Sequence, residues 1–170
     1  MLRIDNCFDL PIMSRARDRS DGRWRLSLSR TVGRILPETI VIAVVDDDAS
    51  MREAVTGLLK SAGFSSIAFE RGEDFLNSDH RRSAACLIAD VQMPEMSGPE
   101  LHSRLAASGE RIPTILITAY PDENVRTRAL RAGVKFYLTK PFDDDDFLAR
   151  VRSALDSRAA DGERQRRYDT

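Results

Sequence analysis

Five short runs rich in β-branched and aromatic residues alternate with five segments of helical periodicity in the middle of the chain. The strand-like runs are 40–45, 65–69, 85–89, 114–118 and 135–139. The helical segments are 50–63, 72–78, 99–108, 122–132 and 143–158, and glycines stop the first, third and fourth. This alternation predicts an α/β fold, in which a doubly wound, five-stranded parallel sheet carries helices on both faces.

The first run leads directly into three aspartates, in the sequence VIAVVDDDAS at residues 41–50. A continuous apolar run is typical of a strand buried on both faces, whereas Asp46, Asp47 and Asp48 repel one another and resist desolvation. In doubly wound folds, ligands bind beyond the carboxyl ends of the strands. We therefore expect a ligand to offset the charges of Asp46 and Asp47. We assign Asp48 to the amino terminus of the next helix, where negative charge is favourable.

Other polar residues follow the neighbouring strands of the predicted sheet. Asp90 ends the third strand, Thr118 ends the fourth, and Lys140 follows the fifth. Clustered carboxylates favour a hard cation, and Mg²⁺ takes oxygen ligands while it keeps several waters. An amine and a hydroxyl beside such a cation would bind phosphoryl oxygens. These residue types predict a magnesium site for phosphoryl transfer, built from Asp46, Asp47, Asp90, a backbone carbonyl and waters.

Four segments resemble the motifs of the response-regulator receiver domain, the phosphoacceptor domain of two-component signalling. They are VVDDDAS (44–50), LIADVQMPEMSG (87–98), ILITA (115–119) and YLTKPF (137–142). The resemblance implies a flavodoxin-like sheet with the strand order 2-1-3-4-5. It places the receiver domain at residues 39–156.

The resemblance also implies a role for each residue at the carboxyl edge of the sheet. Asp90 would accept a phosphoryl group from a histidine kinase or a phosphotransfer protein, and Lys140 would neutralise that group. Mg²⁺ would be held by the carboxylates of Asp46, Asp47 and Asp90 and by the backbone carbonyl of Gln92. The domain would then be a stoichiometric phosphoacceptor with magnesium-dependent self-phosphorylation and dephosphorylation chemistry, and not an enzyme.

A signalling switch is implied by the same resemblance. Thr118 would hydrogen-bond the phosphoryl group, and Tyr137, at the aromatic switch position of the family, would turn into the space that Thr118 vacates. The helix 122–132 and the strand 135–139 would then repack, which changes the face that they form with the helix 143–158. We expect this face to bind a downstream protein.

Two other functions compete with a signalling receiver. The chain could be a phosphate sink that diverts phosphoryl groups from another regulator. The segment DDDAS also nearly fits the D-x-D-x-[TV] motif of haloacid-dehalogenase-like phosphatases, in which Asp46 would be the nucleophile. Ser50 departs from that motif, and the loop DVQMPEMSG has no place in that family. The aspartate that takes the phosphoryl group, Asp90 or Asp46, distinguishes a receiver from such a phosphatase.

Local signals give expectations for several single residues. Ser50 and Glu53 have the spacing of a capping box at the start of the first helix. The acidic run 143–146 suits the first turn of the last helix. The resemblance implies a cis bond between Lys140 and Pro141.

Two histidines and one cysteine have simple structural interpretations. We expect His80 and His102 to lie on the surface, because neither has a partner in the sequence. Cys86 falls within a buried strand and is expected to be a core residue.

The charges are unevenly distributed. Residues 1–38 carry eight arginines and five acidic residues without sustained periodicity, which predicts a disordered, basic amino-terminal extension. Residues 39–156 carry 14 basic and 19 acidic residues, so we expect no nucleic acid as a partner. Residues 157–170 are polar and predict a carboxy-terminal tail too short for a helix-turn-helix. This favours a stand-alone receiver.

The apolar runs and the cysteines bear on location. No apolar run approaches the roughly 18 residues of a transmembrane helix, and the amino terminus lacks the apolar region of a signal peptide. Cys7 and Cys86 suggest neither a disulfide framework nor a metal site. We therefore expect a cytoplasmic protein without a membrane span. A homodimer that forms on phosphorylation is compatible with the resemblance.

Overall fold

The computed structural model describes residues 40–168, and the side chains of residues 40–158. The predicted extension 1–38 lies outside the described residues. The strands are β1 (Val41–Val45), β2 (Ser65–Phe69), β3 (Ala84–Asp90), β4 (Thr114–Thr118) and β5 (Phe136–Thr139). The helices are α1 (Ala49–Ser61), α2 (Gly72–Asn77), α3 (His80–Ser83), α4 (Gly98–Ala107), α5 (Glu123–Arg131) and α6 (Asp144–Tyr168).

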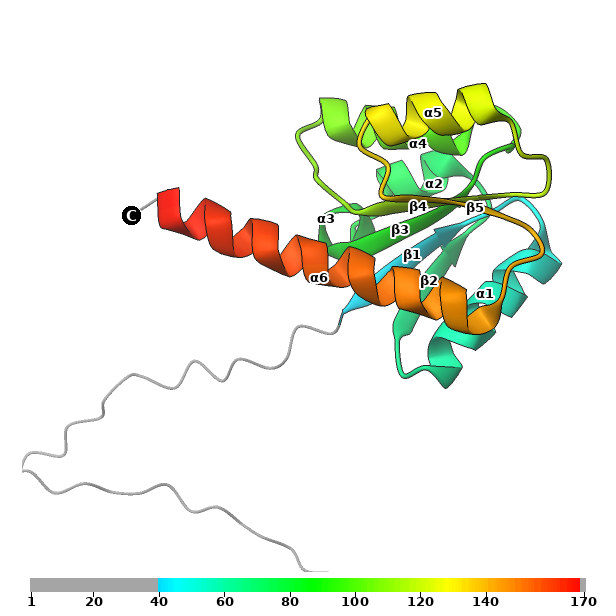
Figure 1. The fold of residues 1–170 in the computed structure, drawn as a ribbon, viewed down its shortest axis with the longest axis horizontal. Coiled ribbons are helices and arrows are strands. Elements are labelled where there is room, and N and C mark those ends of the chain that lie inside the picture. The colour runs from blue at the N-terminus through cyan, green and yellow to red at the C-terminus, as the bar shows by residue number, and fades with distance from the viewer. Residues whose placement is uncertain (1–39, 169–170) are drawn as a thin grey trace, which may run out of the picture. The chain divides into compact units, whose positions relative to one another are not determined.

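The five strands form one parallel sheet in the order β2-β1-β3-β4-β5 (Figure 1). This order confirms the predicted doubly wound fold. The register aligns the carboxyl ends of the central strands, because Val45 of β1 pairs with Ala89 of β3, and Asp90 pairs with Ile117 of β4. The residues that follow β1, β3 and β4 are therefore delivered to one edge of the sheet.

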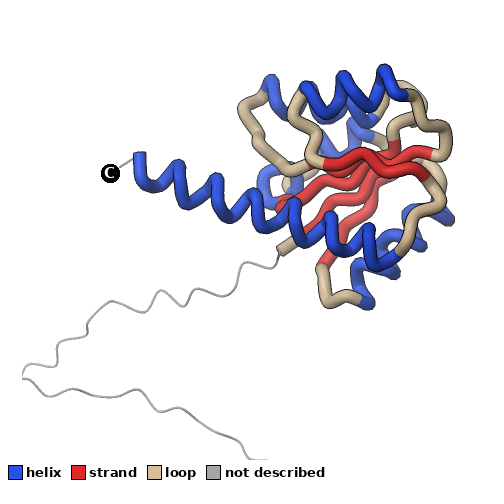
Figure 2. Tube along the Cα trace, in the orientation of Figure 1, coloured by secondary structure: helices blue, strands red, loops and turns tan. Residues whose placement is uncertain are grey.

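Helices cover both faces of the sheet (Figure 2). Alternate residues along each central strand point to opposite faces, as the period of two in a strand requires. On one face, side chains of the strands pack with Phe75 of α2, Leu101 of α4 and Ala129 of α5. On the other face they pack with Leu59 of α1 and Phe147 of α6. Burial on both faces explains why the central strands read as continuous apolar runs.

The start of α1 differs from the prediction. Asp48 is the N-cap, and its carboxylate accepts hydrogen bonds from the backbone N–H groups of Ser50 and Met51. The predicted capping box of Ser50 and Glu53 is therefore wrong, because the chain leaves β1 by a turn that makes Asp48 the first side chain able to reach these donors. The assignment of Asp48 to the helix amino terminus is confirmed.

Two helical segments exceed the prediction. The short helix α3 between α2 and β3 was not expected from the sequence. Helix α6 continues to Tyr168, past the predicted end at residue 158, so the polar segment predicted as a tail is helical up to that point. The residues there are mainly alanine, arginine, glutamate and glutamine, which have high helix propensity. Between residues 40 and 168, no helix is long and apolar enough to cross a membrane.

Candidate phosphoacceptor site

Two carboxylates meet at the carboxyl edge of the sheet. Asp46 directly follows β1 and is 1% exposed, and Asp90 is the last residue of β3 and is 6% exposed. Since Val45 and Ala89 are register partners, the next residue on each strand brings these two acids side by side. The site thus depends on the pairing of two strands whose acidic residues are distant in sequence.

Lys140 joins the two carboxylates. Its Nζ donates to Asp90 Oδ1 at 2.6 Å and to Asp46 Oδ2 at 3.0 Å. Lys140 follows β5, and its backbone N–H donates to the carbonyl of Thr118, at the end of β4, at 2.7 Å. The bond between Lys140 and Pro141 is cis, as predicted. One ammonium group therefore connects the ends of β1, β3 and β5.

Burial and pairing shift the pKa values of the site in definite directions. Desolvation raises the pKa of Asp46 above its ordinary value, although hydrogen bonds from the Asp48 N–H and from Lys140 oppose this. For Lys140, desolvation alone would lower the pKa, but the hydrogen bonds and charges of Asp90 and Asp46 outweigh it and raise the pKa. Lys140 therefore stays protonated at neutral pH and offsets part of the carboxylate charge.

Backbone N–H groups hold the other two carboxylate oxygens. The Asp48 N–H donates to Asp46 Oδ1 at 2.9 Å, and the Gln92 N–H donates to Asp90 Oδ2 at 2.6 Å. The loop after Asp90 returns close to its own strand, because a Cβ on Gly98 would lie 2.3 Å from the Asp90 carbonyl oxygen. Gly98 is therefore needed for close approach, and it allows α4 to begin directly beside the site.

Thr118 and Tyr137 lie on the neighbouring strands β4 and β5. The Thr118 hydroxyl is buried, accepts from the Tyr120 N–H at 3.1 Å and donates to the Tyr120 carbonyl at 3.2 Å. Tyr137 packs against the core, and its hydroxyl is buried without a hydrogen-bond partner among the described residues. The switch roles predicted for these two residues stay predictions.

The donor set of the site fits Mg²⁺ in chemical type. Mg²⁺ is usually bound by one or two carboxylates and several waters, and the structure brings the oxygens of Asp46 and Asp90 together. Among the described side chains, no group of three acidic, histidine or cysteine residues is arranged to hold a metal ion. Asp47, the residue after Asp46 in the chain, is exposed. The ligand roles of Asp47 and of the Gln92 carbonyl stay predictions.

The expectation of a surface position holds for His80 and is wrong for His102. His80 is exposed, whereas His102 is 8% exposed. His102 lies on the inner stripe of α4 with Leu101 and Leu105, so helical spacing turns it inward. Its Nδ1 lies 2.9 Å from the Thr114 hydroxyl, and its Nε2 lies 3.2 Å from the Ala132 carbonyl. Both ring nitrogens have partners, which makes this burial tolerable.

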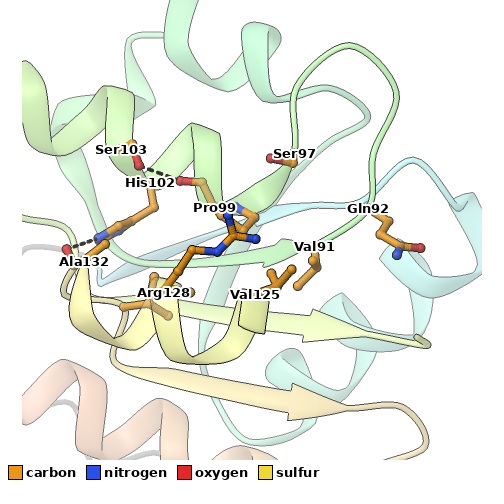
Figure 3. Close-up of a pocket in the computed structure, with 11 residues that line it drawn as sticks. Val91, Gln92, Ser97, Pro99, His102, Ser103, Val125, Arg128 and Ala132 are labelled. Carbon is orange, nitrogen blue, oxygen red and sulfur yellow. Dashed lines mark hydrogen bonds between the residues drawn. The ribbon is translucent and has the colours of Figure 1, made fainter. Parts of the chain in front are cut away.

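His102 borders a hollow of about 470 Å³ between α4 and α5 (Figure 3). Val125 and Ala129 of α5 contribute apolar walls, and Gln92, two residues after Asp90, also lines the hollow. Neither Asp90 nor Lys140 lines it. The hollow is therefore distinct from the carboxylate site.

Cys86 is buried in β3, as predicted, and desolvation raises the pKa of its thiol to about 12. It is a core residue. Arg52 was not identified from the sequence as part of the site, although its Nη1 donates to the Asp46 carbonyl at 2.7 Å. The sequence contains only one indication of this role, which is that Arg52 lies about one helical turn after the three aspartates.

Comparison with known proteins agrees with this geometry. The family model of the response regulator receiver domain matches residues 42–152. The response regulator protein TodT of Pseudomonas putida is 40% identical over 115 residues, which cover 68% of this chain and 51% of TodT. The transcriptional regulatory protein FixJ of Bradyrhizobium diazoefficiens is 37% identical over 114 residues, which cover 67% of this chain and 56% of FixJ.

Solved structures give the same result. The response regulator StyR superposes with a TM-score of 0.72 and 36% identity, covering 77% of this chain and 66% of that chain. The structure of FixJ-N has a TM-score of 0.64 and 30% identity, covering 69% of this chain and 94% of that chain. The chain belongs to the response-regulator receiver domain family of two-component systems. It spans about half the length of the curated relatives that it matches.

Proposed function

We propose that the chain works in a phosphorelay, in which Asp90 takes a phosphoryl group from a histidine kinase or a phosphotransfer protein. The supporting observation is the contact of Lys140 Nζ with Asp90 and Asp46 at the carboxyl edge of the sheet. Asp90 is favoured over Asp46 as the acceptor, because its side chain is 9% exposed and that of Asp46 is 2% exposed. A donor group has better access to the more exposed carboxylate.

In the proposed step, a carboxylate oxygen of Asp90 attacks the phosphorus of the donor phosphohistidine. A P–O bond forms and the P–N bond breaks, and its electron pair stays on the donor imidazole. Lys140 lies within hydrogen-bond distance of Asp90, so its ammonium is positioned to neutralise the transferred group. A bound Mg²⁺, held by Asp46, Asp47, Asp90 and the Gln92 carbonyl, would supply further charge neutralisation. Each chain accepts one phosphoryl group, so the role is stoichiometric.

The output follows from Thr118 in this proposal. Its hydroxyl is bonded to both backbone polar groups of Tyr120, so a turn toward the phosphoryl group releases the loop that leads into α5. Tyr137 on β5 then turns inward, and the face formed by α5, β5 and α6 changes. We propose that this face binds a downstream protein, with a homodimer as one form of the phosphorylated state.

We propose that the partners of this domain are proteins in the cytoplasm and not nucleic acid, because residues 39–156 carry an excess of acidic residues. The transcriptional regulatory relatives are longer, and this chain matches about half of their length. None of the contacts among the described residues favours a phosphate sink or a haloacid-dehalogenase-like phosphatase.

The proposal is tested by incubation with acetyl phosphate and Mg²⁺, followed by intact mass measurement. The wild type is expected to gain the mass of one phosphoryl group, and Asp90→Ala is expected to gain none. Asp74→Ala, an exposed acid on α2, is the matched control and should be modified like the wild type. Modification that persists in Asp90→Ala and disappears in Asp46→Ala would reject Asp90 as the acceptor.

A further inference from the structure

Arg52, on the second turn of α1, contacts the acidic turn at two points. Its guanidinium Nη1 donates to the Asp46 carbonyl at 2.7 Å, and its backbone N–H donates to the Asp48 carbonyl at 3.0 Å. The side chain is half-buried. A charged donor at this distance makes one of the stronger hydrogen bonds found in proteins.

The bond from Arg52 completes the set of partners around Asp46. The Asp46 N–H donates to the Phe69 carbonyl of β2, one carboxylate oxygen accepts from the Asp48 N–H, and the other accepts from Lys140. Its carbonyl lies past the last residue of β1, where the ladder with β3 has ended. A buried carbonyl without a donor is costly, and Arg52 supplies the donor.

The direction of this carbonyl matters for Asp47. The Asp46 carbonyl belongs to the planar peptide that joins Asp46 to Asp47, so holding the oxygen holds the plane from which Asp47 extends. On the other side, Asp48 is held as the N-cap of α1. Asp47 is itself exposed, so its direction depends on these two neighbours.

We propose that Arg52 is a positioning residue for the cation site. Its hydrogen bond to the Asp46 carbonyl holds the 46–47 peptide, and so restricts the directions from which the exposed Asp47 carboxylate can reach a cation bound by Asp46 and Asp90. This inference rests on the proposed function, because it assumes that these carboxylates bind Mg²⁺. The inference gives a role to Arg52, whose positive charge alone would oppose the binding of a cation nearby.

The direction in which Mg²⁺ affinity changes when Arg52 is replaced distinguishes a positioning role from a purely electrostatic effect of its charge. A cationic side chain near a bound dication repels it, so removing the guanidinium would strengthen Mg²⁺ binding if charge alone acted. Removing a group that orients a ligand weakens binding, typically by about 10- to 100-fold for outer partners of metal ligands. The two explanations therefore predict opposite changes in Arg52→Gln.

The test is a calorimetric titration of Mg²⁺ into the unphosphorylated chain of 170 residues. We expect the dissociation constant of Arg52→Gln to rise about tenfold. Arg52→Lys, which keeps a donor and the charge, should show a smaller rise. Arg104→Gln, on the exposed face of α4, is the matched control and should bind like the wild type. An unchanged or tighter dissociation constant in Arg52→Gln would overturn the inference.

Unfolding curves show whether each variant folds, and the wild-type titration shows whether the chain binds Mg²⁺ at all. If Arg52→Gln fails to fold, Arg52→Met, which removes both the donor and the charge, decides, and unchanged Mg²⁺ affinity in that folded variant would overturn the inference. A wild type that binds no Mg²⁺ and is not modified at Asp90 would overturn the proposed function, and the inference with it. A wild type that does both, beside an Arg52→Gln variant of equal affinity, would overturn the inference alone.

Discussion

At the scale of single residues, the site is organised by Lys140, which gives one charge to two buried carboxylates. The raised pKa of Lys140 means that its proton is bound more tightly in the folded chain than in the unfolded chain. Its contribution to stability is therefore complete below pH 10.5, its unfolded value, and is lost as the pH rises through the higher folded value.

The variant Lys140→Met tests this linkage. At pH 7 with EDTA, its free energy of unfolding should be lower than that of the wild type by about 3 kcal/mol, because two buried carboxylates lose their counter-charge. Above pH 10.5 the difference should shrink, because the unfolded wild-type chain then releases this proton, which the folded chain still holds until the pH reaches its higher pKa. Urea unfolding across this range measures both effects. Lys60→Met, at an exposed position on α1, controls for general effects of pH, and a difference that grows at high pH would contradict the argument.

Tyr137 presents a different single-residue problem, since its hydroxyl is buried without a partner in the described part of the chain. A buried unpaired hydroxyl is destabilising, and removing it while keeping the ring is favourable. We expect Tyr137→Phe to raise the free energy of unfolding by about 1 kcal/mol. Tyr120→Phe, on a side chain that is 72% exposed, should change little. A loss of stability in Tyr137→Phe would mean that the hydroxyl has a stabilising partner.

At the scale of elements, local signals and tertiary packing agree for most helices. Gly63, Gly109 and Gly133 follow α1, α4 and α5 with positive φ, as their sequence positions predict. Gly57 is different, because it lies inside α1, is exposed, and has no atom within 4 Å of the place where a Cβ would stand. The helix therefore carries the entropic cost of a glycine without any packing reason.

Gly57→Ala should raise the free energy of unfolding by about 0.5–1 kcal/mol, because alanine loses less backbone entropy in a helix. Chemical unfolding measures the change. The matched substitution Gly133→Ala should instead be destabilising, because Gly133 has a φ of +102°. A loss of stability in Gly57→Ala would point to a requirement for glycine that the packing of α1 does not show.

At the scale of the whole molecule, the proposed cation site would couple cation binding to folding. Asp46 and Asp90 meet only when β1 and β3 are paired, so the unfolded chain lacks the site. A cation that binds only the folded chain stabilises it by RT ln(1 + [L]/Kd). Stability should therefore depend on the Mg²⁺ concentration.

At a Mg²⁺ concentration ten times its dissociation constant, the free energy of unfolding should rise by about 1.4 kcal/mol. Urea unfolding with and without MgCl₂, at matched ionic strength, measures this increment. Asp47→Asn and Asp90→Ala should lose most of it, whereas Asp74→Asn should keep it. An increment of full size in Asp47→Asn would remove Asp47 from the proposed ligand set.

Much of the fold and part of the site could be predicted because their signals are local. The apolar runs marked all five strands, and glycines marked the ends of α1, α4 and α5. The rule that ligands bind at the carboxyl ends of parallel strands brought Asp46, Asp90 and Lys140 into one predicted site. The burial of His102 was missed, because both of its partners, Thr114 and Ala132, lie on other elements.

The sequence by itself determined the type and order of the strands and main helices, since periodicity and helix stops act over a few residues. Only the tertiary structure decided which polar atoms meet. Lys140 contacts Asp90 and Asp46, which lie 50 and 94 positions earlier in the sequence. The Arg52 guanidinium donates to the Asp46 carbonyl, which needs a donor because it is buried at the edge of the sheet. Asp48 caps α1 in place of the predicted capping box for a similar reason, because the turn out of β1 determines which oxygen reaches the free N–H groups. Such contacts depend on distances between elements, and local patterns do not encode them.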